Sequence, residues 1–133
     1  MNAQAAFEYM VIAMLVLGFL TPVWIYLLTI QNQSRTELSL SYAKFAVERT
    51  ADVADFVYSQ GPPANMKVKI YIPPGIEYYN ITNHTIRLKV RVQEGVTDVF
   101  AVSKAVLNGT FPINEGTYWI NIKAFDDYVN ISY

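Results

Sequence analysis

The sequence contains no cysteine and only one histidine, His84. Without cysteine it can form neither a disulfide framework nor a thiolate-ligated zinc or iron-sulfur site. A single histidine also excludes a multi-histidine metal site, and His84 lies beside an expected turn, where no catalytic triad can be built around it. The sequence has no glycine-rich phosphate loop, and the Asp126-Asp127 pair is more typical of a polar turn than of a calcium site. We therefore expect no enzyme activity, no metal and no cofactor.

Charge is absent from a long segment near the N-terminus, because residues 10–30 contain no Asp, Glu, Lys or Arg. As a helix rising about 1.5 Å per residue, this run is roughly 31 Å long, which matches the hydrocarbon core of a bilayer. It is longer than the apolar region of a removable secretory signal. The first basic residue is Arg35, on the far side of the run. The sequence thus predicts a helix that can span a membrane.

Proline and glycine are missing between residues 31 and 60. Apolar side chains recur there with helical spacing at Leu38, Tyr42, Phe45, Ala46, Val53, Phe56 and Val57. We expect one helix from about Ala3 to Tyr58, apolar all round over residues 4–30 and amphipathic over residues 31–60, with Gly61-Pro62-Pro63 as its stop. Pro22 should bend this helix or cost it a hydrogen bond.

Beyond residue 60 the period of the apolar pattern changes to two, which is typical of strands. Seven strands are expected, near residues 67–72, 77–81, 85–92, 96–103, 105–111, 118–124 and 128–133, with turns at Asn108-Gly109, Glu115-Gly116 and Asp126-Asp127. The predicted fold is α+β, with a long helix (1–60) and a small antiparallel, Ig-like β-sandwich (61–133) packed on the amphipathic half of that helix.

Acceptor triplets for N-glycosylation, Asn-x-Ser/Thr, are over-represented. Five of the nine asparagines begin one: Asn32, Asn80, Asn83, Asn108 and Asn130. Chance would give about one, since Ser and Thr make up about one residue in nine. Such triplets are used only in extracytoplasmic compartments, so they predict an extracellular, glycosylated β region. Asn and Thr are also common in turns and strands, which leaves each single triplet a weak signal.

The segment Asn2-Ala3-Gln4-Ala5-Ala6-Phe7-Glu8-Tyr9-Met10, followed by the apolar run, resembles the class III signal peptide of archaeal type IV pilins. In that family the motif reads small residue, Gln, two small residues, an apolar residue, Glu, then Tyr or Phe. The basic head that usually precedes the motif is not matched by Met1-Asn2-Ala3. The β region, with Val68–Ile76 and Tyr118–Ile122, is similar to the extracellular domain of the same group.

The resemblance implies a function for the segment. A prepilin peptidase would cut between Ala3 and Gln4, and the pilus assembly machinery would move the helix from the membrane into the core of a homo-oligomeric filament. The core residues would be Phe7, Tyr9, Leu15, Leu17, Phe19, Pro22, Trp24 and Leu27. Glu8 would fix the axial register of subunits, because a carboxylate in apolar surroundings needs a charged partner. The β domains would form an adhesive outer surface toward host or abiotic surfaces.

Other interpretations stay open. A monomeric, membrane-anchored protein that binds a sugar or an envelope partner fits the same pattern, and Glu8 is then a solvated carboxylate at the mouth of a membrane helix. Five basic residues take outward strand positions: Lys67, Lys69, Arg87, Lys89 and Arg91. They could form one basic strip that binds DNA or an anionic surface, with Tyr78 and Tyr79 nearby, but a solvated sheet face explains them more simply. The net charge of −1 makes a nucleic acid an unexpected partner. The ten tyrosines suit either an adhesive surface or plain strand propensity.

Overall fold

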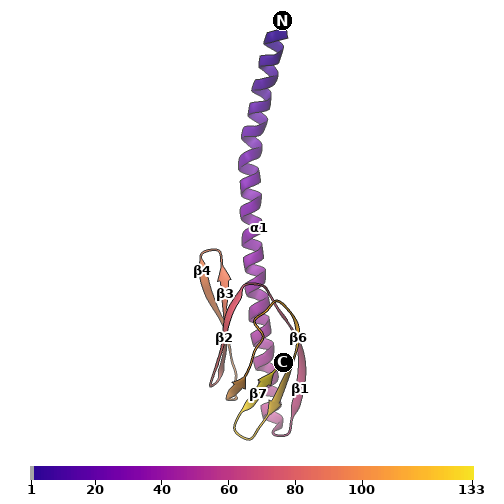
Figure 1. Cartoon of the computed structure of the whole chain (residues 1–133), viewed down its shortest axis with the longest axis vertical. Helices are drawn as coiled ribbons and strands as arrows, with labels where there is room; N and C mark the ends of the chain where they lie inside the picture. The colour runs from indigo at the N-terminus through magenta and orange to yellow at the C-terminus, as the bar shows by residue number, and fades with distance from the viewer. Residues whose placement is uncertain (1) are drawn as a thin grey trace. The chain divides into compact units, whose positions relative to one another are not determined.

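The computed structural model describes residues 2–133, and over this range it contains one helix and seven strands (Figure 1). The elements are α1 (Asn2–Gln60), β1 (Asn65–Ile72), β2 (Ile76–Thr82), β3 (Thr85–Val92), β4 (Gly95–Val102), β5 (Leu107–Gly109), β6 (Gly116–Ala124) and β7 (Val129–Ser132). The prediction of an α+β fold with a single long N-terminal helix is confirmed.

The chain forms two compact units that divide after Arg35. The first contains the residues of α1 up to Arg35, and the second, Thr36–Tyr133, contains the rest of α1 and all the strands. Most of the amphipathic part of the helix, from Thr36 on, therefore belongs to the same compact unit as the β region.

The helix ends where the sequence places its stop signal. Gly61 has φ +79°, the left-handed conformation that glycine adopts without steric cost. Its N–H donates to the carbonyl oxygens of Val57 and Tyr58, both at 3.2 Å, so the last turn closes on itself. Ala64 N then donates to Gly61 O at 3.0 Å, which turns the chain into β1.

The strands form two sheets, with orders β1-β6-β7-β5 and β2-β3-β4. All pairs are antiparallel except β5–β7, which is parallel. The expected two-sheet arrangement is confirmed, but the finer expectation of a fully antiparallel, immunoglobulin-like sandwich is corrected. In a constant-type immunoglobulin domain no more than two consecutive strands lie in the same sheet, whereas three consecutive strands, β2, β3 and β4, form one sheet here.

The predicted turn at Asn108-Gly109 is wrong, because both residues lie in β5. Gly109 has φ +127°, and a Cβ there would lie only 1.9 Å from the carbonyl oxygen of Ile131 in β7. Only glycine, which has no Cβ, allows the backbones of β5 and β7 to approach this closely. Thr110 N donates to the same Ile131 oxygen at 2.9 Å, which ends the short parallel pair.

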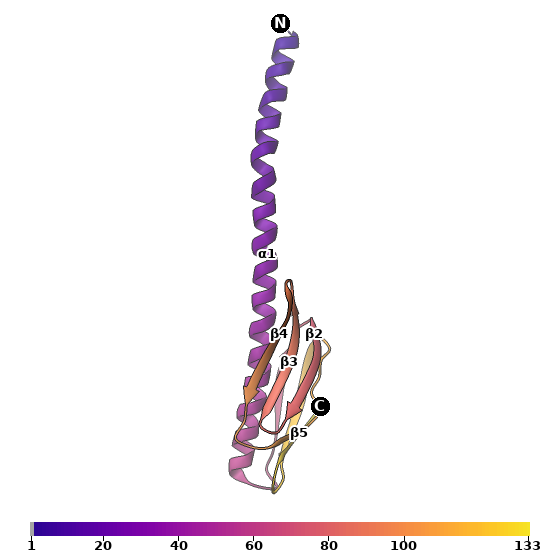
Figure 2. The same cartoon turned by 90° about the vertical axis from the view of Figure 1, so that its left-hand side faces the viewer.

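A continuous apolar core joins both sheets to the second half of α1. The buried face of the helix consists of small side chains, since it is formed by Ala43, Ala46, Val47, Thr50, Ala51, Ala54 and Val57. The inner faces of the strands supply the larger ones, among them Ile70, Ile72, Ile86, Leu88, Ile120, Ile122 and Ile131. Figure 2 shows the three-stranded sheet beside this part of the helix, with β4 along it.

The apolar stripe expected on the helix is corrected by this core. Of its seven members only Ala46 and Val57 are buried, and Val53 packs partly against the core. The remaining large side chains, Leu38, Tyr42, Phe45 and Phe56, are exposed. Sheets pack closely where the helix offers small side chains. The helix therefore buries its alanine-rich face against the sheets, and the face with the aromatic residues stays exposed.

Two hydrogen bonds and one aromatic contact join the helix to the β region. The Asp55 carboxylate accepts a hydrogen bond from the Ser103 hydroxyl and another, at 2.7 Å, from the backbone N–H of Lys104. The rings of Tyr42 and Tyr71 meet edge to face, with centroids 5.3 Å apart, which ties the helix to β1. These contacts place β1 and the end of β4 next to α1.

Candidate functional site

The apolar surface of the first unit is the most distinctive feature of the described residues. An 18-residue window of α1 has a mean hydropathy of 2.3, and none of it is buried. All the predicted core side chains except Pro22 are large hydrophobics that stand exposed, from 55% for Leu27 to 75% for Phe19. Soluble monomers rarely expose contiguous apolar patches of more than a few hundred Å². This half of the helix therefore requires a lipid or protein environment and indicates membrane association or secretion.

This segment combines one backbone position that lacks a donor with two hydroxyl groups that are hydrogen-bonded within the helix. Pro22 lies inside α1 and has no N–H to donate to the carbonyl of Gly18. The hydroxyl of Thr21 donates to Leu17 O at 2.8 Å, and that of Thr29 donates to Ile25 O at 2.9 Å. The two hydroxyls are therefore paired within the helix, which lowers the cost of placing them in hydrocarbon.

Glu8 is exposed on the apolar half of α1. Phe7, Val11 and Ile12 line a shallow hollow with it. Within residues 2–133 Glu8 has no ion pair, because the described ion pairs are Lys44–Glu48 and Arg91–Glu77. A positively charged partner for this carboxylate would have to come from another molecule or from a new α-amino group made by cleavage of the chain. Ala3 and Gln4, the predicted cleavage site, lie on the preceding turn of the same helix.

Most of the predicted glycosylation residues lie on the β region. Asn32 lies in the first unit, exposed on α1, and the other four lie on or between strands. Asn83, with φ +44°, occupies the two-residue turn between β2 and β3 and is exposed. Asn80 and Asn130 are half-buried in β2 and β7.

Asn108 and Asn130 are neighbours, because they are register partners in the parallel pair β5–β7. Asn108 Oδ1 accepts a hydrogen bond from Gly109 N at 2.8 Å, so its side chain is turned along its own backbone. Each of the five triplets has at least part of its asparagine at the surface. Glycosylation at these residues stays a prediction.

His84 and the acidic residues are not arranged as a catalytic or metal site over the part of the chain that the structure describes. His84 Nδ1 lies 3.0 Å from Ala105 O, and His84 O accepts from Ser103 N at 2.7 Å. Residues 2–133 include no group of three or more His, Asp or Glu side chains placed to hold a metal ion. The contacts of His84 hold the β2–β3 turn against the segment after β4.

The possible basic strip does not form as one patch, since its residues belong to two sheets. Lys67 and Lys69 lie on β1, whereas Arg87, Lys89 and Arg91 lie on β3. Lys69 Nζ is 5.9 Å from the centroid of the Trp119 ring, and Arg91 pairs with Glu77 at 2.6 Å. The positive charge is therefore divided between two separate faces.

One titratable group of the second unit is perturbed where β1 meets the helix. Partial loss of hydration raises the pKa of Tyr71 above its usual value, and the nearby Glu115 carboxylate and Tyr42 raise it further. The Tyr71 hydroxyl donates to Glu115 Oε1 at 3.5 Å. Tyr71 is thus favoured in its neutral form.

No family model, curated protein or solved structure matches this chain. Its architecture is like that of pilins: one long N-terminal helix is apolar in its first part and packs against a β region in its second part.

Proposed function

We propose that the chain is the structural subunit of an extracellular archaeal type IV adhesion pilus. It polymerises through the apolar half of α1 and displays a glycosylated β domain. The single observation that carries the proposal is an apolar half of a helix with none of its most apolar window buried, whose second half is packed into a folded domain. A simple anchor would not require one continuous helix through both parts.

The energetic argument concerns where the apolar half can reside. At roughly 25 cal/mol per Å² of apolar area removed from water, exposing this surface outside the cell is strongly unfavourable. Lipid covers it before assembly, and the same segments of other subunits cover it afterwards. The prepilin peptidase and the assembly machinery are the partners that this transfer needs.

Glu8 gives the polymer its register in this proposal. A carboxylate among Phe7, Val11 and Ile12 costs several kcal/mol in a dry bundle unless an opposite charge meets it. Cleavage after Ala3 would free an α-amino group at Gln4, and the amino group of an adjacent subunit could then pair with Glu8. A slip between subunits would leave the carboxylate unpaired, so one register is favoured.

The test is the substitution Glu8→Gln in the full chain. We expect it to insert into the membrane as the wild type does and to form no filaments, because the pairing charge is lost while the shape is kept. Glu37→Gln is a matched control, since Glu37 is an exposed carboxylate on the same helix outside the apolar run. Normal filaments from the Glu8→Gln chain, seen by electron microscopy, would contradict the proposed role of Glu8.

A second candidate function is a monomeric, membrane-anchored surface protein, since the same exposed helix also fits a single membrane span. Electron microscopy and an intact mass of material sheared from cells distinguish the two. The pilus proposal expects a helical polymer whose subunits begin at Gln4 and carry glycans. If the protein is a monomeric membrane-anchored protein, we expect no polymer and an uncleaved chain that is monodisperse in detergent.

A further inference from the structure

The β region has two open edges. The edge strands of its sheets are β1 and β5 in one, β2 and β4 in the other. The β2 and β5 edges cover each other, since β2 lies against β5 and Leu107 N donates to Asn83 O at the end of β2. No strand within residues 2–133 pairs with the outer edge of β1 or β4. Each of these edges presents unpaired backbone groups over eight residues.

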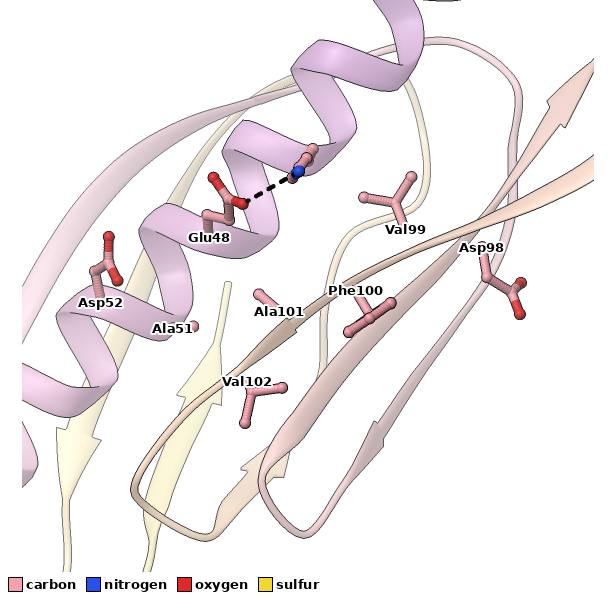
Figure 3. Close-up of a pocket in the computed structure, with 9 residues that line it drawn as sticks. Glu48, Ala51, Asp52, Asp98, Val99, Phe100, Ala101 and Val102 are labelled. Atoms are coloured by element: carbon pink, nitrogen blue, oxygen red, sulfur yellow. Dashed lines mark ion pairs between the residues drawn. The ribbon is translucent and has the colours of Figure 1, made fainter.

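A groove of about 580 Å³ runs beside the open edge of β4. Five consecutive residues of the strand, Asp98–Val102, line one side, and the α1 residues Lys44, Glu48, Ala51 and Asp52 line the other (Figure 3). Residues that face both sides of β4 contribute, so the groove follows the strand edge itself. Five residues of strand span about 16 Å, and the groove is therefore a place where a further strand can be added.

The outward face of β4 is apolar although it is exposed. Val96, Phe100 and Val102 stand 50%, 57% and 63% exposed, and Asp98 is the charged side chain among them. Long, exposed apolar edges are pairing sites that soluble proteins normally block with lysine, proline or a bulge. β4 has only the Asp98 carboxylate in that role, so its edge is prepared for a partner.

The charge around the groove is mainly negative. Its rim carries the carboxylates of Glu48, Asp52 and Asp98, against one ammonium group, Lys44. Lys44 Nζ already lies 3.8 Å from Glu48 Oε1. A strand that enters here is therefore favoured if it brings positive charge.

The basic residues of β3 include two that lie opposite β4, since Lys89 is the register partner of Asp98 and Arg87 that of Phe100, but neither forms an ion pair with β4. Arg91 pairs with Glu77 at 2.6 Å, and Lys89 Nζ lies 5.6 Å from the ring centroid of Tyr78. Both partners belong to β2, on the side of β3 opposite to β4. Within residues 2–133 neither Asp52 nor Asp98 forms an ion pair, so both rim carboxylates are open to positive charge from a partner.

The other open edge carries the complementary charge. The outward positions of β1 are Asn65, Lys67, Lys69 and Tyr71, with no carboxylate among them. Lys69 Nζ lies 5.9 Å from the Trp119 ring, and within residues 2–133 neither lysine forms an ion pair. We propose that β1 of a second copy of this chain pairs edge to edge with β4 and fills the groove between β4 and α1.

The same charges select against the two symmetric alternatives. Pairing β1 with β1 would bring lysines together, and pairing β4 with β4 would bring Asp98, Glu48 and Asp52 together, which disfavours both. Pairing of β4 with β1 joins two different surfaces and leaves a free β1 and a free β4 at the ends. Such a contact is heterologous, and repeated copies grow into an open helical polymer when the rotation does not close. The inference rests on the proposed pilus function and adds a subunit contact outside the apolar helix.

The absence of cysteine makes the pairing directly testable. One full-length chain carries Phe100→Cys on β4, another carries Lys67→Cys on β1, and a short bismaleimide is added to assembled or detergent-solubilised protein. We expect cross-linked dimers from the mixture of the two chains and none from either alone. A chain with both substitutions should give a ladder of covalent multimers.

The other outcomes contradict either the strand pairing or the pilus proposal. Cross-linked dimers of the Phe100→Cys chain alone would show a symmetric contact instead, and a cross-link to a different protein would make the partner something other than a second copy. Filaments without any β4–β1 cross-link refute the strand pairing and leave the pilus proposal intact. A ladder of cross-linked multimers in detergent, from cells that make no filaments, would support the strand pairing and contradict the pilus proposal.

A charge exchange tests the specificity of the contact. Adding Lys69→Glu to the Lys67→Cys chain should lower cross-linking at least about tenfold, because like charges then face each other. Adding Asp98→Lys to the Phe100→Cys chain should restore it. Lys123→Glu is the matched control, since Lys123 is exposed on β6, which is paired on both sides. A loss that Asp98→Lys fails to restore, or an equal loss from Lys123→Glu, refutes the charge pairing.

Discussion

The two halves of α1 use apolar residues in opposite ways. Up to Arg35 the helix carries large side chains such as Phe19 and Trp24, and none of its most apolar window is buried. Beyond Thr36 it buries small ones, such as Ala43, Ala46 and Ala54, each fully shielded from solvent. One continuous helix is thus adapted to two environments. The second half has its cover within its own chain, and the first half needs cover from outside.

Burial and side-chain size follow from this difference. Close packing between a helix and strands favours small residues at the contact, because each added methylene must fit an already filled core. A helix that meets lipid or exchangeable neighbours has no such fixed surface and gains most from large apolar area. Phe45 and Phe56, exposed in the second half, resemble the first half in this respect.

The largest expected effect comes from a charge placed on each half. Val47→Asp buries a carboxylate in the core, where Val47 is fully shielded, and should cost several kcal/mol, a large part of the total stability of a domain. Leu17→Asp should leave the β region folded, because Leu17 is exposed, and should instead impair membrane insertion. Hydrogen exchange of the strand amides in detergent measures the first effect, and membrane fractionation measures the second. If the strand amides of the Leu17→Asp chain also lose their protection from hydrogen exchange, the two halves of α1 do not differ in the way described.

A smaller effect is expected from side-chain size alone. Ala46→Leu overfills the contact between helix and sheets and should lower the free energy of unfolding by about 1–3 kcal/mol. Phe45→Leu, one residue away on the exposed face, should change it by less than about 0.5 kcal/mol. Chemical denaturation of both chains in the same detergent gives the two values. Equal destabilisation would mean that Phe45 also contributes to the fold.

The sequence predicted the elements better than their faces. The single helix, its stop at Gly61 and seven strands followed from glycine and proline placement and from the change of period, which are local properties. The buried stripe of α1 was missed because alanines are weak hydrophobic signals, while Phe45 and Phe56 dominate any apolar pattern. The role of Gly109 was missed for a different reason, since its close approach to Ile131 joins residues far apart in the chain.

The candidate sites divide in the same way. The apolar run and the position of Glu8 can be read directly from the sequence, because they depend on residue type alone. The groove beside β4 depends on which strand becomes an edge and which helix face lies next to it. One signal was present in the sequence: Val96, Phe100 and Val102 alternate with Val99 and Ala101, so that both faces of this strand are apolar. A strand with two apolar faces needs cover on both.

The smallest expected effect concerns the contact of the second half of α1 with β1. The raised pKa of Tyr71 means that the folded chain holds the phenolic proton more tightly than the unfolded chain. This contribution to stability is fully present below the usual tyrosine pKa of about 10 and is lost as the pH rises through the folded value. Tyr71→Phe should therefore flatten the fall in stability at alkaline pH while changing little at neutral pH. Denaturation curves across this pH range, with Tyr78→Phe as an exposed control that does not touch α1, measure it. If the alkaline fall in stability is equally steep in the Tyr71→Phe chain, the contact of Tyr71 with Glu115 and Tyr42 does not link protonation to folding.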